Sequence, residues 1–190
     1  MKKILLLVII TISTLLNQSL AQQVPDIKTN HITIRHNDTV CTFYIYDRSK
    51  KIVPKRDKYY YWYKTQQIIC THGGYSGQLL DGDYTEFYPN KNLRTKGYFK
   101  KGLKAGIWHS WNPSGEFTQI TTWKSGEKNG ESFEYDSTGH LTSKSTYSNG
   151  QLNGPSTTYF PKGVEKTIIY KNGQLVPEKA PKDSSVKKIQ

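Results

Sequence analysis

Glycine and aromatic residues recur along residues 82–175 at a constant spacing of 24 positions. A glycine opens each unit, and aromatic side chains return at the sixth and eighteenth places, and at the third place of the first two units, among largely polar residues. The opening glycines are Gly82, Gly106, Gly130 and Gly154, and the aromatic residues are Tyr84, Trp108, Phe87, Trp111, Tyr135, Tyr159, Phe99, Trp123 and Tyr147. A constant period of about 20 to 50 residues is typical of a repeat array.

Each unit is predicted to be a β-hairpin, because alternating segments are separated by residues that favour turns. Further glycines recur at the tenth and twenty-first places, and we interpret them, with the opening glycines, as turn positions. They are Gly115, Gly139, Gly163, Gly102, Gly126 and Gly150. The segment Asn112–Gly115 combines Pro and Gly at places that suit a type I turn. A lone hairpin is marginally stable, so stacked neighbours must stabilise one another.

The spacing of the recurring places along a strand predicts which face of the sheet each side chain occupies. The twelfth and eighteenth places are six residues apart, which puts them on one face of an ideal strand. Small or polar residues such as Gly97 lie between them and leave space for a neighbouring aromatic ring. The third and sixth places differ in parity, so either a bulge corrects the strand or the sheet carries aromatic residues on both faces.

The same columns extend back to residue 58, because Tyr60 and Tyr63 lie 24 residues before Tyr84 and Phe87. The expected units are 58–81, 82–105, 106–129, 130–153 and 154–175. A small β region with a linker is expected at 22–57 and a disordered tail at 176–190. The predicted fold class is all-β: an elongated, single-layer antiparallel sheet or solenoid of about five 24-residue hairpins.

Residues 1–21 have the layout of a cleaved signal peptide. Lys2 and Lys3 precede an apolar stretch, and Ser19 and Ala21 suit a signal peptidase that cuts after Ala21. The alternative is a retained membrane anchor, for which the apolar stretch is short. No cysteine precedes Cys41. We therefore expect an exported bacterial protein of the periplasm, the cell surface or the medium that carries no lipid.

Composition limits the kind of core and the kind of partner. Apolar residues make up 35% of the chain and aromatic residues 13%, which suits a sheet face covered by Tyr and Trp better than a thick aliphatic core. The net charge of +12 is spread along the chain rather than concentrated, so no nucleic-acid partner is expected. The charge indicates either a solvated basic surface or attraction to an acidic protein, an anionic membrane surface or an acidic glycan.

Two cysteines, Cys41 and Cys70, could form a disulfide outside the cytoplasm. The alternative is two free thiols. The five histidines have no spacing that suits a zinc site, and no pair of carboxylates is marked as acid and base. His72 lies close to Cys70, but a turn beside a structural cysteine explains this pair better than a nucleophile. No catalytic residue, metal site or cofactor is therefore predicted.

The segment from Gly106 to Gly115 and the columns from Leu141 through Tyr147 to Gly150 resemble MORN-repeat-variant proteins. The resemblance covers about residues 58–175 and rests on glycines and packing aromatics. Proteins of this family are described as antitoxin components of toxin–antitoxin systems, and MORN-type repeats are also linked to membrane surfaces and scaffolding. The resemblance implies a β-hairpin solenoid with a protein-binding role.

Our leading hypothesis is a non-enzymatic, exported module that binds another protein as a scaffold at the cell envelope. One alternative is an antitoxin or immunity protein that neutralises a toxin. A second alternative is a binder of glycans or of anionic lipid surfaces, with four aromatic residues as a stacking platform, although their regular recurrence favours a role in the core. The platform residues are Tyr84, Trp108, Trp111 and Trp123.

Overall fold

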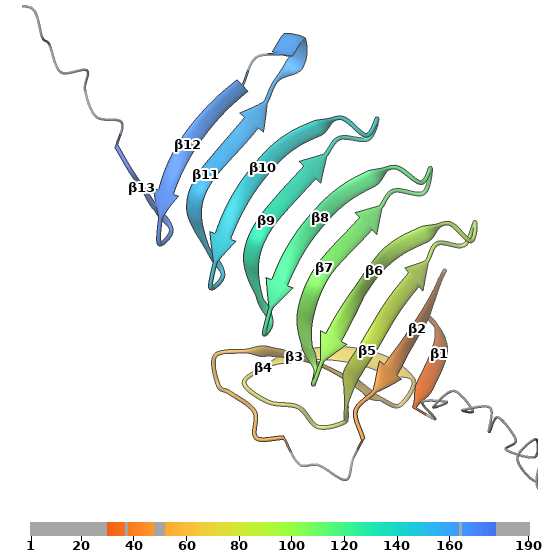
Figure 1. Ribbon diagram of the computed structural model, residues 1–190. Helices are drawn as coiled ribbons and strands as arrows, with labels where there is room; N and C mark the ends of the chain where they lie inside the picture. The colour runs from red at the N-terminus through yellow and green to blue at the C-terminus, as the bar shows by residue number, and fades with distance from the viewer. Residues whose placement is uncertain (1–29, 37, 48–51, 164, 178–190) are drawn as a thin grey trace, which may run out of the picture.

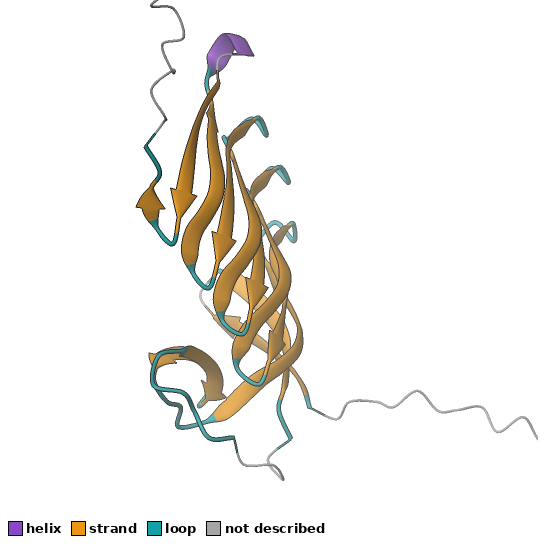
Figure 2. Cartoon of the chain, turned by 60° about the vertical axis from the view of Figure 1, so that its left-hand side comes forward, coloured by secondary structure: helices purple, strands orange, loops and turns teal. Residues whose placement is uncertain are grey.

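A computed structural model describes residues 30–36, 38–47, 52–163 and 165–177. The described residues form one open antiparallel sheet of thirteen strands, most of them in chain order (Figure 1). The predicted all-β, single-layer repeat architecture is confirmed. Viewed from the side, the sheet is long and strongly twisted (Figure 2).

The strands and one short 3-10 turn have the following bounds. They are β1 (His31–His36), β2 (Thr39–Ile45), β3 (Tyr59–Lys64), β4 (Gln67–His72), β5 (Gln78–Phe87), β6 (Leu93–Lys100), β7 (Leu103–Trp111), β8 (Phe117–Lys124), β9 (Glu127–Tyr135), β10 (Leu141–Ser148), β11 (Gln151–Tyr159), η1 (Pro161–Gly163), β12 (Glu165–Lys171) and β13 (Gln174–Leu175).

Two-residue turns join neighbouring strands at one end of the strands, and we call the border of the sheet that these turns form the tight-turn edge. Both central residues have positive φ, as in Ser125 (50°) and Gly126 (83°), which suits the twist of the flanking strands. The Gly126 N–H donates to the Lys104 carbonyl of β7 at 2.9 Å. Equivalent bonds join Gly102 to Leu80, Gly150 to Lys128 and Gly173 to Leu152. Each tight turn is thus tied to the preceding unit.

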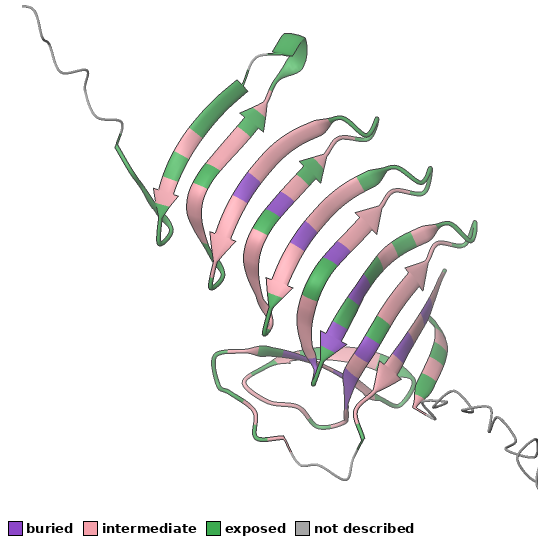
Figure 3. Cartoon of the chain, in the orientation of Figure 1, coloured by how far each residue is buried: buried purple, intermediate pink, exposed green. Residues whose placement is uncertain are grey.

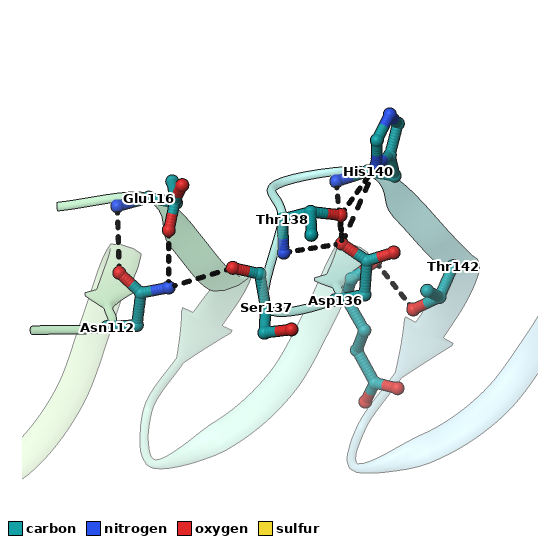
Figure 4. A network of polar contacts seen from close by, with 8 residues as sticks. Asn112, Glu116, Asp136, Ser137, Thr138, His140 and Thr142 are labelled. Atoms are coloured by element: carbon teal, nitrogen blue, oxygen red, sulfur yellow. Dashed lines mark hydrogen bonds and ion pairs between the residues drawn. The ribbon is translucent and has the colours of Figure 1, made fainter. Parts of the chain in front are cut away.

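Longer turns at the opposite edge are organised by one Asn or Asp side chain. Asn112 Oδ1 accepts hydrogen bonds from the N–H groups of Ser114 and Glu116, both at 3.0 Å. Asn112 Nδ2 donates to the Ser137 carbonyl of the next turn at 3.3 Å. Asp136 holds that next turn in the same way (Figure 4). These short polar side chains replace backbone partners within turns and also connect neighbouring units.

The four opening glycines lie inside β5, β7, β9 and β11, whereas the sequence predicted turn positions for them. The register of β9 against β8 shifts around Gly130, so β9 carries extra residues there. Gly130 has a φ of 116°, and a Cβ at this position would lie 3.1 Å from the Thr122 Cβ. Glycine is required at this bulge by both its backbone conformation and its close contact.

In the units that begin at Gly82, Gly106 and Gly130, a second bulge moves the twelfth place to the other face. Between β7 and β8 the register passes from Ser110 opposite Gln119 to Trp111 opposite Phe117, which leaves Thr118 as an extra residue. Because Ser110 and Trp111 are adjacent in a strand, Phe117 and Gln119 lie on opposite faces. The prediction that the twelfth and eighteenth places share a face is therefore wrong, and aromatic residues occur on both faces.

We call the face that carries Trp108 and Trp123 the inner face, and the face that carries Trp111 and Phe117 the outer face. The buried apolar residues of the described chain all lie between Cys41 and Trp108: Cys41, Phe43, Tyr60, Trp62, Leu79, Leu80, Phe99 and Trp108. Beyond Trp108 the buried positions of the inner face are the hydroxyl residues Thr121, Ser132 and Ser145 (Figure 3). The core therefore changes from aromatic to polar along the sheet.

The hairpin β3–β4, which belongs to the predicted first unit, does not continue the stack. β2 pairs with β5 in its place, while β3 pairs with β5 only through Trp62 and Tyr63. The hairpin turns through Thr65 and Gln66, both with positive φ, instead of through a five-residue turn. It lies across one end of the sheet, where Tyr61, Tyr63 and Ile68 pack on the buried cluster (Figures 1 and 2).

Candidate functional site

Three aromatic side chains meet on the inner face where the hairpin covers it. The Tyr84 and Trp108 rings stack with centroids 5.6 Å apart, and Phe99 meets the Trp108 ring edge-on at 4.8 Å. Trp108 lies over Gly97, where a Cβ would come within 2.2 Å of the indole. The small residue predicted to leave space for an aromatic ring does so at this position. Trp108 is 6% exposed and acts as a core residue.

The Lys104 ammonium lies among three aromatic faces. Its Nζ is 4.3 Å from the centroid of Trp108, 4.9 Å from Trp123 and 5.5 Å from Tyr61. Burial lowers the pKa of Lys104 below its ordinary value. No described carboxylate lies within ion-pairing distance of it. Attraction to the ring faces offsets part of the cost of removing this charge from water.

A pocket of about 250 Å³ opens beside Lys104, and we call it the Lys104 pocket. Its polar wall is formed by Thr95, Ser110 and Gln119, which lie opposite one another on β6, β7 and β8. Glu86 also lines it, and its carboxylate accepts hydrogen bonds from Arg94 at 3.1 Å and from the Tyr84 hydroxyl at 3.3 Å. The full lining is Tyr61, Ile68, Tyr84, Glu86, Thr95, Phe99, Lys104, Trp108, Ser110, Gln119, Thr121 and Trp123.

The hairpin contacts the tight-turn edge through its backbone. The Tyr61 N–H donates to the Gly102 carbonyl at 2.8 Å, and the Tyr61 ring packs on Phe99 with centroids 5.0 Å apart. Lys58, just before β3, forms an ion pair of 2.5 Å with Glu127, which follows the next tight turn. The hairpin therefore spans two units of the edge, and it docks through both backbone and side chains.

Farther along the inner face, the cross-strand pairs are small hydroxyl residues. The Thr121 and Ser132 hydroxyls are 2.9 Å apart, and those of Ser145 and Ser156 are 2.8 Å apart. Lys128 lies over Tyr147 at 4.8 Å, which repeats the contact of a lysine with an aromatic ring one unit later. This part of the inner face lies beyond the hairpin (Figure 1).

The proposed four-residue stacking platform is divided between two faces. Tyr84, Trp108 and Trp123 line the Lys104 pocket, but Trp111 lies on the outer face. There it stacks on His109 with centroids 5.7 Å apart and packs against Phe117. The other aromatic residues of the sixth place, Phe87, Tyr135 and Tyr159, lie on the outer face as Trp111 does. Phe99 and Tyr147 share the inner face with Trp123.

Cys41 and Cys70 are both free in this structure, which differs from the disulfide considered from the sequence. Cys41 is buried on β2, where it accepts a 3.6 Å hydrogen bond from the Tyr84 hydroxyl, and burial raises the pKa of its thiol. Cys70 is exposed on β4, opposite Tyr61. The two thiols thus have different neighbours on different hairpins.

Some predicted features fall outside the described residues. These are the signal segment with Ala21 and the greater part of the expected tail, residues 178–190. Val176, at the start of that tail, donates a hydrogen bond of 2.8 Å to the Ile169 carbonyl. Within the described ranges, no helix is long and apolar enough to span a membrane. The same ranges hold no cluster of His, Cys, Asp and Glu suited to a metal ion.

Two segments of this sheet can be compared with a known family. Residues 80–101 and 128–149, which are centred on β5–β6 and β9–β10, match the family model of the MORN repeat variant.

These segments are similar to MORN-variant repeats.

The matched segments are two units apart. The hairpin between them shares their turns and bulges, and the hairpin after them shares the tight turn and the bulge at its opening glycine. None of the curated proteins matches the chain. MORN-variant repeats indicate a repeat protein with a binding role, and the repeat family is generally non-enzymatic.

The recurring lysines were not predicted from the sequence to belong to a site, although their regular spacing is visible there. Lys104 and Lys128 occupy the same place in successive units, two residues before an opening glycine. A lysine that recurs within an array of aromatic columns could have been paired with them. The covering residues Tyr61 and Ile68 carry no such signal, because only the displacement of the hairpin brings them to the site.

Proposed function

We propose that this protein is a non-enzymatic binding module that holds an extended, aromatic-rich segment of another protein across its tight-turn edge and inner face. The observation that carries this proposal is a contact within the chain: Tyr61 of β3 donates its N–H to the Gly102 carbonyl and packs its ring on Phe99. The sheet therefore already receives one strand in this manner. Strand-to-surface docking of this type gives affinity through the backbone and selectivity through side chains.

The spacing of the repeats suits an extended partner. Three residues separate Tyr61, at the Gly102 turn, from Lys58, which reaches Glu127 beside the following turn. Three residues of extended chain cover about 10 Å, and two strand-to-strand steps cover nearly the same distance. A segment that crosses the strands consequently meets one unit for every three of its residues.

Later units repeat the groups that receive β3. The Gly126 and Gly150 turns have the geometry of the Gly102 turn, and Trp123 and Tyr147 occupy the place of Phe99. Among the described residues, no turn or loop N–H donates to the Gly126 or Gly150 carbonyl. These units are the ones we assign to the partner.

A peptide of the sequence KYYYWYK, labelled with fluorescein, tests this function by anisotropy with the full chain. We expect saturable binding that is weakened in Tyr147→Ala on the inner face and retained in Tyr135→Ala on the outer face. Methylation of the central peptide nitrogen should weaken binding about fivefold, because it removes one hydrogen-bond donor. Equal binding of the methylated peptide, or equal loss in both variants, would contradict the proposal.

We further propose that the module acts outside the cytoplasm, as a scaffold at the cell envelope. The support is the pattern of residues 1–21, in which a basic start is followed by an apolar stretch and small residues. Mass spectrometry of the chain expressed in a bacterium should find a mature N-terminus at Gln22. An intact chain that begins at Met1 would count against export.

A further inference from the structure

The Lys104 pocket has a composition that the docking of a protein segment does not require. One wall is cationic and aromatic, formed by Lys104 with Trp108 and Trp123. Another part of the lining carries the hydroxyls of Thr95 and Ser110, together with neighbouring amide and carboxylate groups. The pocket has about 250 Å³, which is smaller than the cavities that drug-sized ligands usually fill. Its size therefore suits a compact polar molecule.

The cationic wall is short of a counter-charge. The Lys104 ammonium faces three aromatic rings and lies within ion-pairing distance of no described carboxylate. Glu86, the carboxylate of the same pocket, is paired with Arg94 instead. A half-buried ammonium without an ion pair is costly, and a ligand carboxylate would form with it a strong, charge-assisted hydrogen bond.

The polar wall has unused hydrogen-bonding capacity. Among the described residues, the side chains of Thr95, Ser110 and Gln119 make no hydrogen bond, although they line the pocket side by side. Together with Glu86 they offer both donors and acceptors to a ligand rich in hydroxyls. The nearby carboxylate of Glu86 disfavours a ligand with several negative charges.

We propose that the Lys104 pocket binds one acidic sugar residue of the hexuronate type, with its carboxylate on Lys104, an apolar ring face against Trp123, and its hydroxyls on Thr95, Ser110 and Gln119. This site shares Trp123 with the surface that we assign to the docked segment, but the binding of a sugar does not depend on the peptide-docking function. Trp108 supports the site from the core rather than acting as an exposed stacking surface, since it is 6% exposed. The flat aromatic faces match the apolar face of a sugar ring, and the polar wall matches its rim.

The test uses glucuronate as the probe and the four tryptophan indole N–H signals of the full chain, observed by two-dimensional NMR. Glucuronate should shift the signals of Trp108 and Trp123, which line the pocket, and leave those of Trp62 and Trp111 unchanged. Glucose, which lacks the carboxylate, should bind at least about tenfold more weakly. Acetate, which lacks the sugar ring, should also bind at least about tenfold more weakly.

Two matched lysine variants test whether the ammonium of Lys104 binds the carboxylate of the ligand. Lys104→Met keeps most of the side-chain length and should lower the affinity for glucuronate about tenfold, because the charge-assisted bond is lost. Lys128→Met, one unit later and outside the pocket lining, should leave the affinity unchanged. Gln119→Leu should weaken glucuronate binding without affecting acetate, and it provides a second variant if Lys104→Met does not fold.

Three results would overturn the proposal. They are the absence of indole shifts with glucuronate, equal affinity for glucose or acetate, and equal effects of Lys104→Met and Lys128→Met. Equal affinity for acetate would indicate a general carboxylate site, such as one for an acidic peptide side chain, and would exclude the sugar. Weaker glucuronate binding in Lys104→Met with unchanged binding of the KYYYWYK peptide would show that the charge at Lys104 serves the sugar and not the peptide.

Discussion

The position of Trp108 depends on the missing side chain of Gly97. The indole occupies the space where a Cβ at Gly97 would lie, at 2.2 Å from Trp108 Cδ2. The same indole stacks on Tyr84 and borders the Lys104 pocket. One small residue therefore determines both the packing of the buried cluster and the shape of the candidate site.

Gly97→Ala should destabilise the protein by about 1 to 3 kcal/mol, because the added methyl group forces the indole to move within a packed cluster. Gly74→Ala is the matched control, since a Cβ there meets nothing within 4 Å and Gly74 has no positive φ. Denaturant unfolding followed by tryptophan fluorescence measures both. Equal stability of the two variants would show that Trp108 does not need the space above Gly97.

Burial raises the pKa of Tyr61 to about 12 from an ordinary value of 10.0, and the neighbouring Cys70 adds to the shift. Burial also raises the pKa of Tyr84. Folding therefore favours the neutral phenols. This stabilisation is fully present below pH 10 and is lost as the pH rises through the folded-state pKa.

The free energy of unfolding should consequently fall between pH 10 and pH 12, and Tyr61→Phe should reduce the slope. Tyr59→Phe changes an exposed tyrosine of the same strand and serves as the control. Urea titrations at several alkaline pH values provide the measurement. A slope that is the same for Tyr61→Phe and for the unsubstituted chain would contradict a buried phenol at residue 61.

At the residue scale, the aromatic and glycine columns could be read from the sequence because spacing alone reveals them. The part that Lys104 plays in the site could be predicted only in part. Its recurrence is visible in the sequence, but its burial depends on Tyr61 from the displaced hairpin. The free state of Cys41 and Cys70 could not be predicted, because composition and cellular location say nothing about the separation of two strands.

Among the elements, the tight turns set the stacking of one unit on the next. Both central residues need positive φ, and the later turns meet this need with Asn149-Gly150 and Asn172-Gly173. The turn between β8 and β9 uses Ser125 at a φ of 50° instead. Asn adopts this conformation more readily than Ser, so this turn is less well suited to its geometry.

Ser125→Asn should raise the free energy of unfolding by about 0.5 to 1 kcal/mol, as expected when turn chemistry is matched to turn geometry. Ser114→Asn, in a longer turn where residue 114 has no positive φ, should bring no such gain. Thermal unfolding monitored by circular dichroism compares the two. A gain at residue 114 equal to that at residue 125 would exclude the φ-based explanation.

At this scale the turns were more predictable than the bulges. Pairs such as Asn149-Gly150 are strong local signals for a two-residue turn. A bulge has only an isolated glycine within a strand as its signal, and Gly130 could equally have opened a turn. The bulge at Thr118 has no glycine at all, and it invalidated the expected parity of the twelfth place.

For the molecule as a whole, the consequence of the repeat is that the units from Gly82 onward pair only with their neighbours. The strand order follows the chain from β5 to β13, and each strand pairs with those beside it. Stability in such an array is close to a sum of unit and interface contributions. Removing one complete unit should therefore leave the remaining contacts intact.

Deletion of residues 130–153 joins Asn129 to Gly154 and preserves the alternation of tight and long turns. The shortened chain should fold and be shorter by roughly 10 Å along the stack, because two strands are lost. Small-angle X-ray scattering measures this length, and circular dichroism confirms the β structure. Deletion of residues 130–141, half a unit, breaks the alternation and should prevent folding of the C-terminal strands; a folded half-unit deletion would contradict this view of the array.

The repeat architecture could be predicted from period and turn chemistry, whereas the place of the first unit could not. Residues 58–81 retain the aromatic columns, yet β3–β4 leaves the stack and β2 pairs with β5. Both β2 and β3 pair with β5, and packing across the whole sheet determines which of them continues the stack. The result is the covered end that forms the Lys104 pocket.

The change of the buried column from Phe43 and Trp108 to Ser132 and Ser145 has a mechanical consequence. Tension applied at β13 would act on the weakly packed end first, where strands are held mainly by backbone hydrogen bonds and paired hydroxyls. The strands would peel away in succession, each at a low load, until the aromatic end resisted. A chain held at its two ends would thus yield in small steps and protect the hairpin-covered site from rupture.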